Sequence, residues 1–121
     1  MDDLEKRKKI HLEVKLKFAS DEIICGEGFL RLCELVDETG SLQKASEQMN
    51  LSYTKAWKML KSVENKTSVK LISRVVGGEH GGRSELTEEG REFVKRYQGM
   101  KRELNEEADK IFEKYFVDFY L

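Results

Sequence analysis

The sequence predicts a mainly α-helical fold with a small β component, made of three short helices, a β-hairpin and a long C-terminal helix. Three observations in the 121-residue chain support this prediction. Residues 37–60 hold helix-ending and helix-capping residues at close intervals. Residues 70–86 contain two strand-like runs around a glycine-rich centre. The third observation is an apolar pattern of helical period after Thr87, in a chain that contains no proline.

The three short helices are predicted to follow one another, with a tight turn between the last two. Gly40 is suited to end the first helix, and the Ser41 hydroxyl is suited to cap the second. Asn50 tolerates the left-handed backbone of a tight turn, and Ser52 can cap the third helix. Inward-facing residues recur at helical spacing: Phe29, Leu32, Cys33 and Val36, then Leu42, Ala45 and Met49, then Ala56, Leu60 and Val63.

The third helix leaves a polar face on the outside of this arrangement, formed by Tyr53, Thr54, Lys55 and Lys58. Small residues occur where the second and third helices must approach closely, at Ala45 and Ala56. An exposed polar helix supported in this way is what a helix needs to enter the major groove of DNA. The pattern therefore favours a DNA-binding helix-turn-helix.

Strands are predicted on both sides of the helices. Residues 10–18 alternate between apolar and polar side chains, which is the signature of a half-buried strand. Residues 70–76 and 83–86 are predicted to form a hairpin with residues 77–82 at its tip. A hairpin in this place makes the fold a winged helix-turn-helix. We assign residues 1–86 to the DNA-binding part and residues 87–121 to a dimerisation helix within the same single domain.

The last helix can be capped by Thr87, and Glu88 and Glu89 in its first turn complement the helix dipole. Its apolar positions average about 3.67 residues apart, close to the period of a straight helix. A helix this long leaves its stripe uncovered by a small domain, so we expect a homodimer. The alternative is that the tail folds back on its own domain. The expected dimerisation residues are Phe93, Tyr97, Met100, Leu104, Ala108, Ile111, Phe112 and Tyr115.

A set of short motifs runs through the helices and the hairpin: Glu38-Thr39-Gly40-Ser41, Leu51-Ser52-Tyr53, Ala56-Trp57, Arg74, Gly77-Gly78, Gly81-Gly82, Leu86-Thr87 and Gly90. Together these motifs resemble the N-terminal domain of molybdate-responsive transcription regulators of the ModE type, a winged helix-turn-helix related to that of LysR-type regulators. The resemblance covers residues 10–100 and implies operator binding by a homodimer.

The chain also departs from those regulators. In them, a C-terminal pair of small β-barrel domains binds the oxyanion, whereas this chain ends at Leu121 without such a pair. We therefore expect the chain to bind neither molybdate nor tungstate tightly and to need no cofactor. Regulated genes that concern molybdenum or tungsten are an implication of the resemblance alone. A separate effector-sensing protein is an alternative source of the regulatory signal.

Positive charge is concentrated in the predicted DNA-binding segment. The net charge of the whole chain is −1, but residues 41–84 hold eight Lys or Arg and three Asp or Glu, which gives +5. Residues 1–40 and 85–121 each hold seven basic and ten acidic residues, which gives −3 for each flank. This distribution is the electrostatic footprint expected of phosphate binding.

The candidate DNA contacts have structural alternatives. Ser52 caps its helix whether or not it also meets a phosphate, and Tyr53 either packs on Trp57 or contacts a phosphate. We expect Trp57 to be a core residue. The glycines of the hairpin tip could serve only the turn. The full set of expected DNA contacts is Ser41, Ser52, Tyr53, Thr54, Lys55, Lys58, Arg74, Gly78, His80 and Arg83.

Other classes of function have little support in the sequence. No catalytic triad or phosphate-binding loop of the GxxxxGK[ST] type is present, so we do not expect an enzyme. Cys25 and Cys33 lack the spacing of a metal site, and His11 and His80 are isolated. No signal peptide or apolar membrane span is visible, which predicts a cytoplasmic protein without membrane contact. The remaining alternative is a winged-helix dimer that acts mainly as a protein–protein interaction module.

Overall fold

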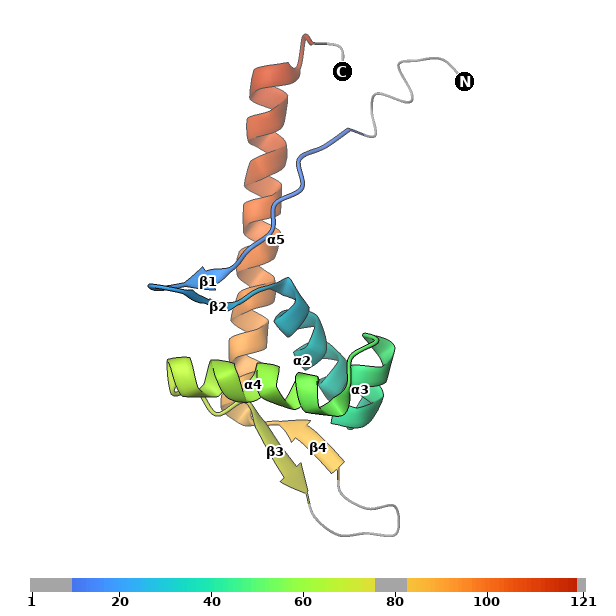
Figure 1. Cartoon of the computed structure of the whole chain (residues 1–121). Helices are drawn as coiled ribbons and strands as arrows, with labels where there is room; N and C mark the ends of the chain where they lie inside the picture. The colour runs from blue at the N-terminus through green and yellow to red at the C-terminus, as the bar shows by residue number, and fades with distance from the viewer. Residues whose placement is uncertain (1–9, 76–82, 120–121) are drawn as a thin grey trace. The chain divides into compact units, whose positions relative to one another are not determined.

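The computed structural model describes residues 10–75 and 83–119. It confirms the predicted fold class, mainly helical with a small hairpin and a long C-terminal helix (Figure 1). The chain divides into two compact units, residues 16–97 and residues 1–15 with 98–121. The elements in chain order are β1 (Phe18–Ala19), β2 (Ile23–Cys25), α2 (Glu27–Thr39), α3 (Leu42–Gln48), α4 (Tyr53–Thr67), β3 (Ile72–Val75), β4 (Arg83–Leu86) and α5 (Glu88–Phe116).

Helix α2 is the centre of the first unit. Leu32, Cys33 and Val36 on its inner face have no exposed surface, and burial of such side chains is the main stabilising term in a small domain. The helix ends at Gly40, whose φ of 68° is in the left-handed region that favours glycine. The Gly40 amide donates to the Val36 carbonyl, so this end of the helix is satisfied as the sequence predicts.

The turn between α3 and α4 also follows the prediction. Asn50 has a φ of 56°, and the Leu51 amide donates to the Ser46 carbonyl at 2.9 Å. Ser41 and Ser52 cap α3 and α4, since each hydroxyl accepts a hydrogen bond from the amide three residues further on at 3.1 Å. These contacts fix the direction in which α4 leaves the turn.

The predicted N-terminal strand is wrong over most of its length. Residues 10–17 form no strand, and only Phe18–Ala19 pair with Ile23–Cys25, in an antiparallel arrangement. A strand requires a hydrogen-bonding partner, and β2 is only three residues long. The apolar side chains of this segment nevertheless become more buried along the chain. Ile10 and Leu12 are exposed, whereas Leu16 and Phe18 pack against the core.

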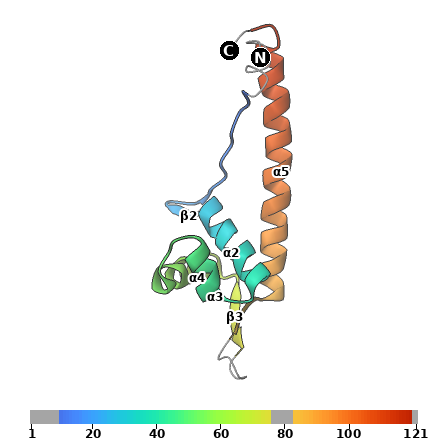
Figure 2. The same cartoon turned by 90° about the vertical axis from the view of Figure 1, so that its right-hand side faces the viewer.

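The first turns of α5 belong to the core of the first unit, where they lie alongside α2 (Figure 2). Phe93 and Tyr97 pack against Phe18, with ring centroids 5.4 and 5.0 Å apart, and Phe93 also meets Phe29. The Tyr97 hydroxyl donates to the Leu16 carbonyl at 2.7 Å. Burial, with smaller contributions from Cys25 and Glu27, raises the pKa of Tyr97 to about 12, so the hydroxyl keeps its proton at neutral pH.

This packing bears on the expected role of α5. The compact unit of residues 16–97 includes the first turns of α5, and the assignment of residues 1–86 and 87–121 to one domain stays a prediction. Tyr97, expected at a dimer interface, is 1% exposed and is already covered by its own chain, and Phe93 packs against the same core. The helical period marked a covered face, but it did not distinguish the chain's own core from a second subunit.

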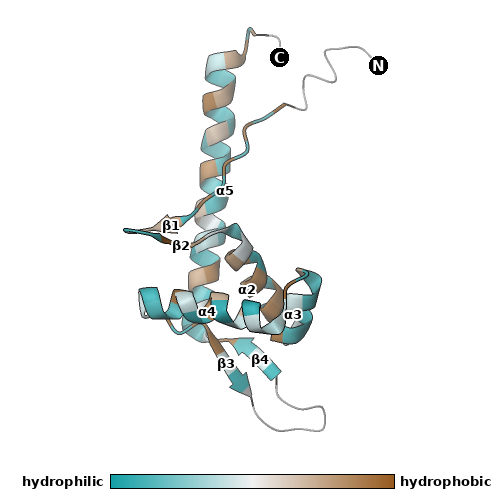
Figure 3. Cartoon of the chain, in the orientation of Figure 1, coloured by the Kyte–Doolittle hydropathy of each residue, from teal (hydrophilic) through white to brown (hydrophobic). Residues whose placement is uncertain are grey.

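The second unit contains the rest of α5. Apolar residues recur among charged ones along this part of the helix (Figure 3). Ala108 is buried, and Phe112 stacks on Phe116 with ring centroids 5.4 Å apart. The other apolar side chains are largely exposed: Met100, Leu104, Ile111, Tyr115, Phe116, Val117 and Phe119.

Helix α5 begins in close contact with the chain before β3. The Thr87 hydroxyl accepts from the Gly90 amide at 2.9 Å, and the Thr87 amide donates to the Leu71 carbonyl at 3.0 Å. A Cβ atom at Gly90 would lie 2.5 Å from that carbonyl oxygen, which no real Cβ tolerates. Gly90 is therefore required by the close approach of two backbones.

We expect Gly90→Ala to lower the free energy of unfolding by about 1–3 kcal/mol, because the backbone must shift to admit the methyl group. Gly99→Ala is the matched control in the same helix, since its Cβ would meet only the end of the Arg102 side chain at 3.8 Å. This control should stabilise the protein by about 0.5–1 kcal/mol through helix propensity. Urea denaturation followed by circular dichroism measures both, and equal effects of the two variants would contradict the argument.

Candidate nucleic-acid interface

Helix α4 presents one apolar and one polar face. Ala56 and Leu60 are fully buried, whereas Thr54 and Lys58 on the opposite side are exposed. The structure thus brings the expected contacts Ser52, Tyr53, Thr54, Lys55 and Lys58 together on the exposed first half of one helix. The Ser52 cap stabilises the first turn of α4, so the backbone that carries these side chains has a defined conformation.

A surface groove of about 490 Å³ lies along one flank of this polar face. Lys55 and Lys58 line the groove together with Met59 and Ser62 of α4, and Phe29 of α2 also lines it. Within the described part of the chain, neither lysine forms an ion pair. Their charges are therefore available to an anion.

The other flank holds a stack that the sequence pattern did not reveal. The Arg74 guanidinium of β3 lies over the Trp57 ring, 4.4 Å from its centroid, and donates a hydrogen bond to the Tyr53 hydroxyl. The Lys61 ammonium is 4.7 Å from the same indole centroid. Trp57 is half-buried and packs against the core cluster, so the expectation that it is a core residue is met in part. The contact with Arg74 links α4 to the hairpin.

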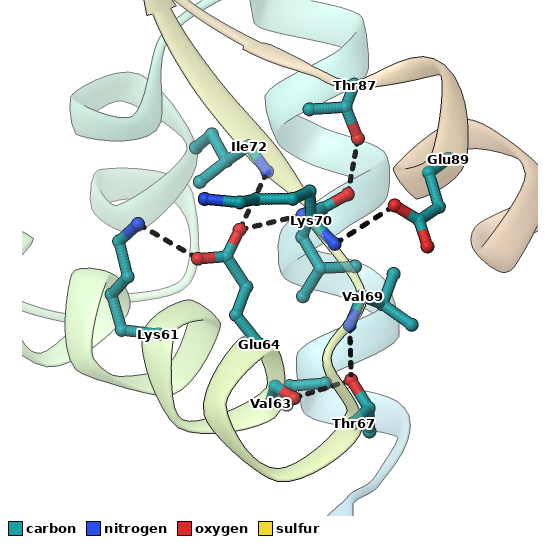
Figure 4. A network of polar contacts seen from close by, with 10 residues as sticks. Lys61, Val63, Glu64, Thr67, Val69, Lys70, Ile72, Thr87 and Glu89 are labelled. Carbon is teal, nitrogen blue, oxygen red and sulfur yellow. Dashed lines mark hydrogen bonds and ion pairs between the residues drawn. The ribbon is translucent and has the colours of Figure 1, made fainter.

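Glu64 forms a second link between α4 and the hairpin, and sequence reasoning missed it as well (Figure 4). Its carboxylate accepts from Lys61 Nζ at 2.9 Å and from the amides of Leu71 and Ile72 at 2.7 and 3.3 Å. Burial acts to raise the pKa of Glu64, but the hydrogen bonds from Lys61 and the two amides outweigh it and lower the pKa. A glutamate among exposed helical charges gives no local signal of this role.

The segment before β3 is held on its other side by the start of α5. The Thr87 hydroxyl donates to the Lys70 carbonyl, and the Lys70 amide donates to Glu89 at 3.3 Å (Figure 4). The hairpin itself is antiparallel, with Ile72 opposite Leu86 and Arg74 opposite Ser84. The base of the hairpin is therefore fixed by both α4 and α5.

The remaining expected contacts lie in different places. Ser41 is half-buried as the cap of α3, away from the first turns of α4 in the sequence. Arg83 is exposed on β4 and pairs with Glu85 at 3.7 Å. Gly78 and His80 lie outside the described residues. The geometry thus brings Arg74 to the α4 face, while Ser41 caps α3 and its contact with DNA stays a prediction.

Over residues 10–75 and 83–119, no cluster of side chains could hold a metal ion, and no helix has the length and apolar character to cross a bilayer. Cys25 and Cys33 are buried free thiols. Burial raises the pKa of both, most strongly that of Cys33. Neither thiol is therefore a reactive nucleophile at neutral pH.

A capped helix-turn-helix followed by an anchored hairpin defines a winged helix-turn-helix protein. Residues 29–91 match the family described as bacterial regulatory helix-turn-helix protein, lysR family. The chain belongs to this family. Its members are regulatory proteins, in agreement with the expectation that the chain is not an enzyme.

The resemblance to ModE-type regulators is confirmed by two relatives. The chain is 33% identical over 85 residues to "Molybdenum transport protein ModE" of Azotobacter vinelandii, a match that covers 70% of this chain and 32% of that protein. It is 32% identical over 74 residues to the protein of the same name from Herbaspirillum seropedicae, covering 61% of this chain and 28% of that protein. The match thus spans about a third of each relative's length.

Solved structures support the fold. Two mutant forms of Lactococcus lactis ZitR superpose with TM-scores of 0.53 and 0.52, covering 93% and 95% of this chain and 77% and 78% of theirs. The sequence identity is 17% in both cases, so the likeness concerns the fold alone.

The Glu64 network predicts a pH-dependent stability. The pKa of Glu64 is lower in the folded chain than in the unfolded chain, so its contribution is present above the unfolded pKa of about 4.5 and is lost as the pH falls through the folded pKa. Glu64→Gln should lower the free energy of unfolding by about 1–3 kcal/mol at pH 7, because buried amides lose a charged acceptor. It should also flatten the decline below about pH 4.5.

The control is Glu89→Gln, whose carboxylate accepts a single backbone hydrogen bond in an exposed position. Guanidinium denaturation at several pH values measures all three proteins. Parallel stability curves for Glu64→Gln and the unaltered chain would show that this carboxylate does not anchor the hairpin.

Proposed function

We propose that the chain is a sequence-specific DNA-binding transcriptional regulator of the ModE type, which binds operator DNA as a homodimer in the cytoplasm. The observation that carries this proposal is the exposed first half of α4, where Lys55 and Lys58 have no carboxylate partner among the described residues. Family membership supports the same function. The regulated genes would concern molybdenum, in line with the names of the two relatives.

In the proposed complex, the Ser52–Lys61 segment of each subunit enters the major groove. Thr54 and Lys58 lie opposite the buried face of α4, so they are the side chains best placed to reach base edges. Lys55 and Ser52 would contact phosphates. Arg74 and Arg83 would meet the flanking backbone or the minor groove, together with Gly78 and His80, which lie between β3 and β4 in the sequence.

Two copies of the chain would pair through the second unit. Leu104 and Ile111 are 42% and 51% exposed, and Tyr115 is 67% exposed, so α5 carries an apolar stripe without cover in the single chain. Met100 and Phe112 would extend the same interface, whereas the buried Tyr97 and Ala108 would contribute little surface. Dimerisation would let two copies of α4 address two half-sites about one helical turn of DNA apart.

The DNA-binding proposal predicts a strong salt dependence. If each subunit neutralises about three to five phosphates, the logarithm of affinity should fall against the logarithm of salt concentration with a slope of about −6 to −9. The Lys55→Ala, Lys58→Ala double variant should bind more weakly, and its slope should be shallower by about one for each phosphate that is no longer neutralised. Fluorescence anisotropy with a duplex selected from a random pool measures both quantities.

The matched control removes two lysines from α5, Lys95→Ala and Lys110→Ala, which changes the net charge equally. Circular dichroism checks that both double variants remain folded. Unchanged affinity of a folded Lys55→Ala, Lys58→Ala variant would remove α4 as the reader of DNA. That result would favour the alternative, a dimer that acts mainly as a protein–protein interaction module.

The dimer proposal predicts that Leu104→Glu with Ile111→Glu gives a monomer at micromolar concentration, because two carboxylates would have to be buried in an apolar interface. Sedimentation velocity measures the mass. Glu106→Ala with Glu113→Ala alters the opposite side of the same helix, since each residue advances the helix by about 100°, and this control should remain dimeric. A monomeric unaltered chain would refute the proposal.

A further inference from the structure

We infer that Tyr53 and Arg74 form one coupled phosphate-binding subsite and that Trp57 is its positioning residue. The inference rests on the proposed DNA-binding function and assigns a specific partner to one flank of α4. Three elements of the geometry carry it: a hydrogen bond, a stack and the exposure of the pair.

The direction of the hydrogen bond determines whether the Tyr53 hydroxyl can donate to a ligand. A guanidinium can only donate, so Arg74 Nη2 occupies a lone pair of the Tyr53 hydroxyl oxygen. The hydroxyl proton is then directed to another acceptor. Tyr53 is 38% exposed, and no acceptor for its proton is found among the described residues. The pair therefore offers a neutral O–H donor beside a cation.

The stack fixes the cation next to that donor. The Arg74 guanidinium carbon is 4.4 Å from the Trp57 ring centroid and 5.6 Å from the Tyr53 ring centroid. A planar guanidinium held against an aromatic ring has few orientations, so its remaining N–H groups keep their direction. A neutral O–H donor held beside charged N–H donors is suited to the oxygens of a phosphate.

The position on α4 favours a backbone phosphate over a base edge. Tyr53 is the first residue of α4, and its contact with β3 places it on the hairpin flank of the helix. The face opposite the core, which would face the bases, belongs instead to Thr54 and Lys58. Side chains on the flank of a helix in the major groove meet the sugar–phosphate backbone.

If Tyr53 and Arg74 form one subsite, their contributions to DNA affinity should depend on each other. Two independent contacts would contribute separately. If Arg74 holds Tyr53 in place, the benefit of the hydroxyl should depend on the guanidinium. Lysine at position 74 keeps the charge but loses the planar stack and the fork of donors. Arg74→Lys should therefore weaken DNA binding and also abolish most of the contribution of the Tyr53 hydroxyl.

The test is a double-mutant cycle in the full chain, with Tyr53→Phe, Arg74→Lys and the combination, on the selected duplex at several salt concentrations. Tyr53→Phe should weaken binding about tenfold with an unchanged salt slope, because it removes a neutral donor to a charged acceptor. In the Arg74→Lys background the same change should cost less than about threefold, which is the sign of coupling.

A second cycle provides the matched control. Arg83 is the exposed arginine of the other hairpin strand, and its described partner is Glu85 instead of an aromatic ring. Arg83→Lys and Tyr53→Phe should combine additively. In the free protein, Arg74→Lys should change the emission of Trp57, the single tryptophan of the chain, whereas Arg83→Lys should leave it unchanged.

Additive losses in the first cycle would overturn the inference, and so would an unchanged affinity of Tyr53→Phe. Lys58→Ala distinguishes this failure from that of the proposed function. If Lys58→Ala weakens binding but Tyr53→Phe does not, only the coupled subsite is refuted. If the chain binds no selected duplex at any salt concentration, the proposed function and the subsite are both refuted.

Discussion

The carboxylate of Glu64 is the contact on which the relation between α4 and the hairpin depends. Burying a carboxylate is costly, and this one is compensated by Lys61 and by the backbone amides of Leu71, just before β3, and Ile72, at its start. Those amides would otherwise be buried donors without an acceptor. Arg74 lies two residues further along β3 than Ile72, so its approach to Tyr53 and Trp57 requires that β3 start at a fixed place against α4.

The local elements were predictable because single residues determine their own backbone. Gly40 and Asn50 adopt left-handed conformations, and Ser41 and Ser52 cap the helices that follow them, as their side chains dictate. Residues 10–17 failed as a strand because alternation indicates which side chains are covered but supplies no hydrogen-bonding partner. Tyr97 was assigned to a dimer interface for the same reason: periodicity indicates a covered face without naming its cover.

The sequence predicted which residues belong to the candidate site better than it predicted the contacts between them. The basic character of residues 41–84 and the outer face of α4 follow from composition and helical spacing. The contacts of Arg74 with Tyr53 and Trp57 join positions 21 and 17 residues apart, and the Glu64 contacts join a helix to the start of a strand. Such pairings arise from the packing of elements, so no local pattern could have specified them.

The described ion pairs of α4 lie in its second half, so the two halves of the helix differ in uncompensated positive charge. In its second half, Lys61 pairs with Glu64 at 2.9 Å and Lys66 with Glu22 at 3.2 Å, which neutralises much of their charge. In its first half, Lys55 and Lys58 have no such partners among the described residues, and the positive end of the helix dipole adds to their charge. Positive potential is therefore concentrated where α4 begins, next to Tyr53 and Arg74. A polyanion approaching this domain would be drawn to the N-terminal half of α4, and that is the end a recognition helix presents to the bases.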